Sequence, residues 1–120
     1  MAVIETPLMR GLARALDLSA FRHQLIASNL ANIDTPGYRT RDLRTFAGAI
    51  ELAMAGEQQP SSPVAYTIRG LLERPDGNNV SVERESLLMA ENQLRFQVAA
   101  QFLKAEFHRL PLAINGGSSS

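Results

Sequence analysis

The sequence contains no cysteine and no tryptophan, and only 6% of its 120 residues are aromatic. The absence of cysteine excludes disulfides, thiolate catalysis and cysteine-ligated metals. Basic and acidic residues balance, 12 against 12, so no charge excess points to nucleic acid or to direct binding of anionic lipid. No apolar run approaches the ~18 residues of a membrane-spanning helix. Aliphatic side chains on helices must therefore supply most of a lean core.

The two ends of the chain also lack features. Residues 1–6 show neither the basic region nor the apolar stretch of a cleavable secretory signal. Residues 111–120 end in Gly-Gly-Ser-Ser-Ser and have no means of packing. We expect both segments to be disordered. The length leaves room for one domain at most between them.

Two long helices are the strongest pattern that is present. The first is expected from about Pro7 to Ala31, within an N-terminal segment 7–33, because Thr6 is a suitable N-cap and Pro7 suits the first helical position. The second is expected over residues 81–110, with acidic residues in its first turn and Pro111 as its stop. Each helix carries more than one apolar stripe. On the first helix, heptad spacing gives a seam that is broken at Ser19 and His23, namely Met9, Leu12, Leu16, Ser19, His23, Ile26, Leu30 and Ile33, and a second stripe consists of Leu18, Phe21 and Leu25. On the second helix, one stripe consists of Leu87, Ala90, Leu94, Val98 and Ala105, and the other of Met89, Phe96, Ala100, Leu103 and Phe107.

A hairpin of two helices in water needs only one apolar face on each. The additional stripes therefore predict contacts with helices of other chains. We expect the isolated chain to be largely disordered or molten, because its core is lean and its second stripes stay unburied. Burial of those stripes on assembly would contribute about 25 cal/mol of free energy per Å², which offsets the cost of ordering the chain.

Residues 34–80 are expected to form a turn, a short helix and a flexible middle loop. Helical spacing of apolar residues from Leu43 to Met54 predicts a short amphipathic helix that ends near Gly56. Residues 64–68 could be a short strand, with no obvious partner except Val80 or another subunit. A strong turn is expected at 75–79. The fold class is all-α: two long antiparallel helices in a coiled-coil-like hairpin, with a short helix and irregular loops between them.

The segment from Ser28 to Arg39 separates the first helix from the rest of the chain. Asn32 can adopt the left-handed conformation that ends a helix. Thr35 precedes a proline, and Pro36-Gly37 suits a type II turn. From these residues alone, the segment is either only a helix end with a turn, or a recognition feature at a subunit junction.

No group of residues predicts catalysis, cofactor binding or a metal site, so we expect a protein that is not an enzyme and has no cofactor. Neither His23 nor His108 has a carboxylate at a spacing that suggests a metal pair, and phosphate loops and nucleophile motifs are absent from the sequence. Asn92 stands in line with apolar residues of the second helix. It either fixes the register of helix pairing, as a lone asparagine in an apolar seam can, or is simply exposed.

Two motifs carry a family resemblance. The stretch from Asn29 to Tyr38 is similar to the N-terminal signature of the bacterial flagellar rod, hook and hook-associated axial proteins. The stretch Asp76-Gly77-Asn78-Asn79-Val80, with three residues of the second helix, resembles the start of the C-terminal helix in the family's proximal rod proteins. The residues that carry the resemblance are Asn29, Leu30, Ala31, Asn32, Asp34, Thr35, Pro36, Gly37, Tyr38, Asn79, Glu85, Asn92 and Phe96.

The resemblance implies a structural subunit of the proximal rod of the flagellar basal body, in the periplasm. Such a subunit assembles helically with itself and with other axial proteins into a hollow drive shaft and export channel. Its implied partners are FlgC, FliE, other rod proteins, the MS ring and export-gate proteins, and its implied route is the flagellar type III apparatus without a cleavable signal. The connection between the helices is too short for the β-rich domain of distal rod and hook proteins.

For the signature itself, the hypothesis is that Asn29 and Asn32 order the helix end and that Pro36-Gly37 fixes the direction of the chain. Tyr38 would then anchor the turn against a neighbouring subunit. Two alternatives stay open: a subunit of the FlgC type, and a small cytoplasmic helical-hairpin adaptor or chaperone that binds a partner helix.

Overall fold

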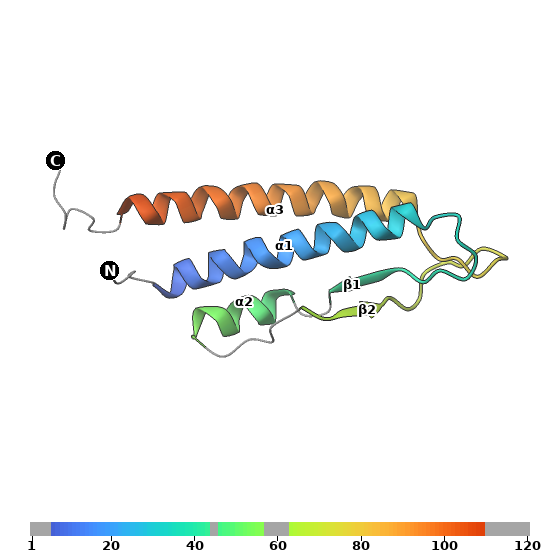
Figure 1. Ribbon diagram of the computed structural model, residues 1–120, viewed down its shortest axis with the longest axis horizontal. Coiled ribbons are helices and arrows are strands. Elements are labelled where there is room, and N and C mark those ends of the chain that lie inside the picture. Colours follow the sequence, from blue (N-terminus) through green and yellow to red (C-terminus); the bar gives the residue numbers. More distant parts are fainter. Residues whose placement is uncertain (1–5, 44–45, 57–62, 110–120) are drawn as a thin grey trace.

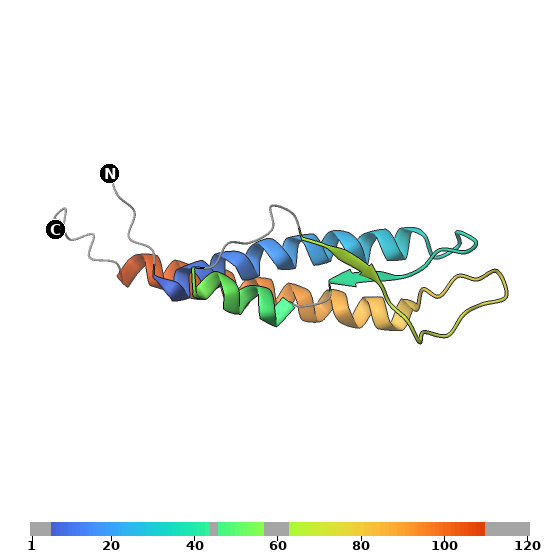
Figure 2. The same cartoon turned by 90° about the horizontal axis from the view of Figure 1, so that it is seen from below.

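The computed structural model describes residues 6–43, 46–56 and 63–109. Its elements are helix α1 (Pro7–Ala31), strand β1 (Arg41–Leu43), helix α2 (Phe46–Met54), strand β2 (Ala65–Thr67) and helix α3 (Val82–Arg109). The two long helices lie antiparallel, and α2 and the two strands lie along one side of the pair (Figures 1 and 2). The helical-hairpin prediction is confirmed. None of the helices in the described residues combines the length and hydropathy needed to cross a membrane.

Helix α1 begins and ends where its sequence predicts, but its C-terminal cap differs. The Thr6 side chain accepts a hydrogen bond from the Met9 N–H at 3.0 Å, so Thr6 belongs to the helix cap and only residues 1–5 of the expected disordered segment lie outside the described residues. The helix ends at Ala31, two residues before the end of the expected segment 7–33. Asn32 has a φ of −104°, so the expected left-handed cap is wrong. Its side chain instead donates to the Ser28 carbonyl at 2.8 Å, which satisfies the helix end without a positive φ.

The buried apolar side chains show which stripes are used within the chain. On α1, Leu18, Leu25 and Ile26 are buried, whereas His23 is exposed although the heptad pattern placed it in the seam. Helix α1 packs against α3 as well as against α2 and β1, so both of its stripes find partners inside the molecule. The buried apolar residues are aliphatic or methionine, as the composition suggests: Met9, Leu18, Leu25, Ile26, Ala53, Val80 and Ala99.

Helix α2 packs on the first turns of α1, as a short helix in the expected place. A Cβ atom on Gly11 would lie 2.4 Å from the Met54 Cγ atom, so only glycine permits this approach. Arg10 donates to the carbonyls of Ala53 (3.1 Å) and Met54 (2.9 Å), which are among those left unpaired at a helix C-terminus. Gly56 then takes a φ of +79° and ends the element.

The two short strands form an antiparallel pair with Asp42 opposite Tyr66. The strand expected near residues 64–68 is therefore present. Its partner within the chain is β1, the segment that follows the turn at residues 35–38, and not Val80. Asp42, the central residue of β1, is buried. The expected tail 111–120 lies outside the described residues.

Candidate functional site

The turn after α1 is built by backbone hydrogen bonds. The Thr35 N–H donates to the Asn32 carbonyl at 3.0 Å, and the Tyr38 N–H donates to the Thr35 carbonyl at 3.2 Å. Gly37 has a φ of +75°, the sign that the third position of a type II turn needs. The Thr35 hydroxyl donates to the Asn32 side-chain oxygen at 3.0 Å. The local chemistry read from the sequence thus gives a turn of the expected kind.

A second turn, at residues 74–78, lies directly against the first. The Gly37 N–H donates to the Asp76 carbonyl at 2.8 Å, and the Asn79 N–H donates to the Tyr38 carbonyl at 3.3 Å. A Cβ atom on Gly77 would lie 3.4 Å from the Gly37 Cα atom, and Gly77 has a φ of +85°. The two turns therefore meet backbone to backbone, and glycine at position 77 serves the positive φ of its turn, since a Cβ there would make only an ordinary contact with Gly37.

Two adjacent asparagines hold this contact. Asn78 is fully buried and donates to the carbonyls of Asn32 (2.9 Å) and Thr35 (2.8 Å), while its oxygen accepts from the Val80 N–H at 2.8 Å. Asn79 accepts from the Thr40 N–H at 2.7 Å. Sequence reasoning selected Asn79 and missed Asn78. The doubled asparagine after Asp-Gly was the available signal, since both side chains can bond main-chain groups of a loop.

Asn29 is the centre of a second cluster, one turn before the end of α1. It is buried, and its amide nitrogen donates to the Arg41 carbonyl and to a Glu85 carboxylate oxygen, both at 2.9 Å. Its oxygen accepts from the Arg41 N–H at 3.1 Å and from the Tyr38 hydroxyl at 3.0 Å. One side chain thus occupies both main-chain groups of Arg41, as a neighbouring strand would, and joins α1 to β1 and to α3.

The Tyr38 hydroxyl is used inside the chain. Besides Asn29, it lies 3.3 Å from the Ser28 hydroxyl. Tyr38 therefore ties the turn back onto α1 through its hydroxyl, and its contact with a neighbouring subunit stays a prediction. The aromatic ring reaches one helical turn behind the helix end, which local sequence patterns do not reveal.

Charged side chains close the same cluster. Glu85 is fully buried and accepts from Arg84 at 2.7 Å. Asp42 accepts two hydrogen bonds from Arg22, at 2.8 and 2.7 Å, and lies 3.6 Å from a nitrogen of Arg84. The buried carboxylates are thus paired with arginines, without which their burial would be strongly unfavourable. Sequence reasoning placed Glu85 at the helix dipole and among the residues that carry the family resemblance, and it did not single out Arg22 or Arg84.

We call these residues the corner joint: Ser28, Asn29, Asn32, Thr35, Gly37, Tyr38, Thr40, Asp42, Asp76, Gly77, Asn78, Asn79, Arg22, Arg84 and Glu85. Asp34 and Pro36 are exposed on the turn. Leu30 is half-buried and Ala31 is exposed on α1.

Asn92 and Phe96 lie apart from the corner joint. Asn92 is buried and donates to the Ser19 carbonyl at 2.8 Å, so the exposed alternative is wrong. Phe96 is exposed. Within the described residues, no three acidic or histidine side chains converge as a metal site requires. The arrangement has the character of a structural joint, with buried polar groups paired across three elements.

The comparisons with known proteins identify what this joint belongs to. The family model for "Flagella basal body rod protein" matches residues 9–39, from the first turn of α1 through the turn at Gly37. The flagellar basal body rod protein FlgB of Salmonella typhimurium is 30% identical over 124 aligned residues, which cover 87% of this chain and 90% of that protein. The chain belongs to the FlgB family of flagellar basal body rod proteins.

Further FlgB proteins are similar over nearly the same span. FlgB of Cereibacter sphaeroides is 34% identical, with 87% of this chain and 91% of the relative covered. FlgB of Bacillus subtilis is 25% identical, with 91% and 94% covered. Membership of the FlgB family makes the chain a structural component of the basal body rod. It decides against the adaptor, the FlgC type and the enzyme.

Proposed function

We propose that this chain is a subunit of the proximal rod that assembles helically, with further copies and with other axial proteins, around an export channel. FlgC, FliE, other rod proteins, the MS ring and export-gate proteins are the proposed contacts. The proposed location is the periplasmic part of the basal body, reached through the flagellar type III apparatus without a cleavable signal. This proposal rests on family membership together with the surface of α3.

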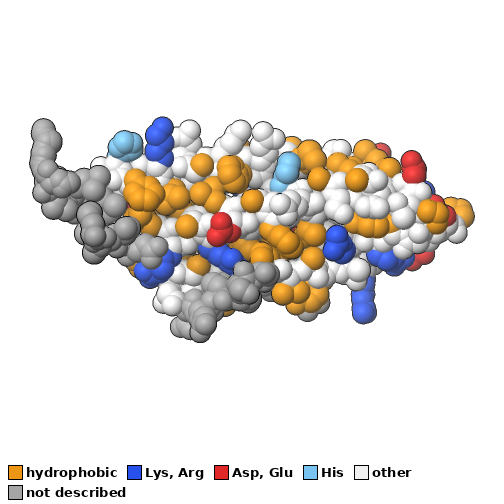
Figure 3. All heavy atoms as spheres, viewed as in Figure 1, with side chains coloured by type: hydrophobic (Ala, Val, Ile, Leu, Met, Phe, Trp, Pro, Cys, Tyr) orange, Lys and Arg blue, Asp and Glu red, His pale blue; other side chains and the backbone are white. Residues whose placement is uncertain are grey.

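That surface is the single observation that supports assembly best. Helix α3 buries only one narrow stripe, Glu85, Asn92 and Ala99, against the rest of the chain. Its other apolar stripe is open: Leu87 and Leu94 are 60% and 61% exposed. Orange side chains are accordingly spread along the helices in Figure 3. The exposed large apolar residues of α3 are Val82, Leu87, Leu94, Phe96, Val98, Phe102 and Phe107.

An apolar strip along a whole helix is costly in water, and burial against helices of neighbouring subunits would return about 25 cal/mol for each Å² covered. Contacts between different patches, repeated by a rotation that does not close, generate a helical filament. The corner joint complements this strip, because it fixes the direction in which the middle of the chain leaves the helix pair.

The test is incorporation into detergent-extracted basal bodies in a strain that lacks the gene. The wild-type chain should co-purify with basal bodies and restore swimming. Leu94→Glu should abolish both, since it places a charge in the strip while leaving the buried stripe untouched. Gln97→Glu adds the same charge at another exposed position of α3 and serves as the control. Recovery of the wild-type chain only in the cytosolic fraction, or full activity of Leu94→Glu, would refute the proposal.

A further inference from the structure

The two edges of the small sheet differ in whether their outward-pointing main-chain groups are hydrogen-bonded within the described residues. The Ile68 N–H donates to the Thr40 carbonyl at 2.8 Å, and Asp42 lies opposite Tyr66. Hydrogen-bonded and non-bonded pairs alternate along an antiparallel ladder. The inward-pointing main-chain groups of the ladder are therefore those of residues 40 and 42 on β1 and of 66 and 68 on β2, with the Thr40 N–H taken by the Asn79 side chain. The main-chain groups of Arg41 point outward from β1, and those of Ala65 and Thr67 point outward from β2.

The outer edge of β1 is closed, whereas that of β2 is open. The Asn29 side chain bonds both main-chain groups of Arg41. No described residue does the same for Ala65 or Thr67. Val64, directly before the strand, is 51% exposed. A pair of three-residue strands gains little stability alone, and an edge with unpaired N–H and C=O groups is a template for another strand.

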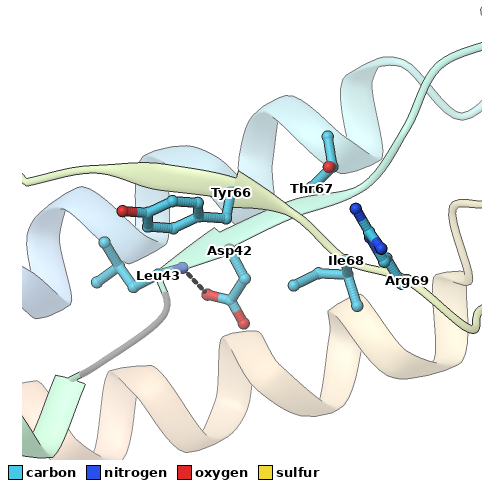
Figure 4. A pocket seen from close by; sticks show the side chains of 6 residues that line it. All are labelled: Asp42, Leu43, Tyr66, Thr67, Ile68 and Arg69. Carbon is cyan, nitrogen blue, oxygen red and sulfur yellow. Dashed lines mark hydrogen bonds between the residues drawn. The ribbon is translucent and has the colours of Figure 1, made fainter.

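The outward face at this edge is cationic. Arg41 lies opposite Thr67 in the register, and Arg69 follows two residues later on the same face. In Figure 4, Thr67 and Arg69 point away from α3, whereas Asp42 and Ile68 point toward it. Arg39 has Glu73 as its partner and Arg22 has Asp42. Among the described residues, the guanidinium groups of Arg41 and Arg69 have no acidic partner, and the carboxylate of the sheet, Asp42, is buried.

We propose that the open edge of β2 binds an extended acidic segment of an adjoining rod protein as a third strand. Main-chain hydrogen bonds to Ala65 and Thr67 would supply affinity that does not depend on sequence, as in other cases of strand addition. Carboxylates of the added strand would meet Arg41 and Arg69, which supplies the preference for an acidic partner. The inference rests on the proposed function for the class of partner.

A second copy of this chain fits the edge poorly. Pairing of β2 with β2 would bring the two cationic faces together, and like charges on neighbouring strands are destabilising. The exposed carboxylates on the loop before α3, Glu73 and Asp76, are already held by Arg39 and Arg74 within the chain. The charge pattern therefore favours a different protein with an extended acidic segment.

The test exploits the direction of the Thr67 N–H. Thr67→Pro removes that outward donor and leaves the ladder between β1 and β2 intact, because the bonded residues are 66 and 68. We expect incorporation into basal bodies to fall about tenfold, the equivalent of a little over 1 kcal/mol. Thr67→Val keeps the N–H and should incorporate like the wild type. Arg69→Glu leaves the backbone unchanged and should also lower incorporation, which separates an edge effect from misfolding caused by proline.

A photo-reactive amino acid at position 67 identifies the occupant. The inference is supported if the cross-linked peptide is an acidic segment of another rod protein and if cross-linking falls in the Arg69→Glu background. It is overturned if Thr67→Pro and Arg69→Glu both incorporate normally, or if the only cross-linked partner is a second copy. Incorporation of the wild-type chain into basal bodies tests the proposed function separately. If the wild type incorporates and the variants do so equally well, the strand-addition inference fails and the proposed function stands.

Discussion

Exchanging the amide of Asn29 for a carboxylate tests the corner joint most directly. Asn29→Asp keeps the size of the side chain and its two acceptor contacts, with Tyr38 and with the Arg41 N–H. It removes both donated hydrogen bonds, to the Arg41 carbonyl and to Glu85. It also places a second carboxylate next to that of Glu85, which is fully buried.

The expected loss follows from those contacts. A hydrogen bond between neutral groups contributes roughly 1 kcal/mol, and one to a charged group roughly 1.5–3 kcal/mol. With the repulsion between two carboxylates added, we expect Asn29→Asp to lower the free energy of unfolding by about 3–5 kcal/mol. That is a large part of the ~5–15 kcal/mol that folded domains typically have.

A second substitution should restore part of this loss. In Asn29→Asp/Glu85→Gln, the glutamine amide donates to the new aspartate, so the contact returns with donor and acceptor exchanged. We expect a recovery of about 2 kcal/mol, and only that, because the Arg41 carbonyl still lacks its donor. Glu85→Gln alone should cost about 2 kcal/mol, because its amide oxygen can still accept from Asn29 but the charge-assisted hydrogen bond from Arg84 is lost.

The assay is urea unfolding followed by far-ultraviolet circular dichroism, at a sucrose concentration that makes the isolated chain fold cooperatively, whereas the chain in buffer alone is expected to be largely molten. Swimming of complemented deletion strains provides a second readout, in which Asn29→Asp should be the most impaired variant and the double variant should swim better than Asn29→Asp. A double variant no more stable than Asn29→Asp would show that the two side chains are not coupled. A loss below about 0.5 kcal/mol in Asn29→Asp would show that the joint does not hold the fold, since surface changes fall in that range.

Four further results are expected. Gly77→Ala and Gly70→Ala should destabilise the chain to a similar extent in urea unfolding, because both positions have positive φ and neither Cβ would clash with a neighbour; a much larger loss at position 77 would contradict this reasoning. Asn92→Leu should strengthen helix association and broaden its specificity, seen as mixed oligomers in sedimentation velocity, and unchanged selectivity would argue against a role in register. Arg10→Ala should speed amide hydrogen exchange in α2 and leave α3 unchanged, because it removes two hydrogen bonds at the end of α2. The isolated wild-type chain should show no sharp calorimetric transition, and a cooperative melt would contradict the expectation that helices are completed by assembly.

Local signals account for what the sequence predicted well. The spacing of apolar residues, the Thr6 cap and the Pro111 stop placed both long helices and the short one within a few residues. The Pro36-Gly37 pair predicted its turn because φ preferences belong to the residues themselves. The same applies to the turn at Gly77.

Contacts between segments distant in the sequence account for the features that sequence patterns did not predict. Strand β1 consists of two charged residues and a leucine, and it shows no alternation of polar and apolar residues that would predict a strand. It is held by Asn29, which lies twelve positions before Arg41, and by β2. His23 was placed in the seam because a heptad count assumes a single partner helix, whereas α1 has partners on two sides. Asn78, Arg22 and Asp42 become significant only when the two turns and the two helices are brought together.

Asp42 has a mechanical consequence. It receives one arginine from each long helix, Arg22 of α1 and Arg84 of α3, and it belongs to neither. Sliding of one helix along the other would pull these arginines apart, so the carboxylate acts as a cross-tie against shear. In the proposed assembly, a force that a neighbouring subunit applies to one long helix would act as shear between the two helices of the subunit. The cross-tie would then let the subunit transmit this force without a change in the register of its helix pair.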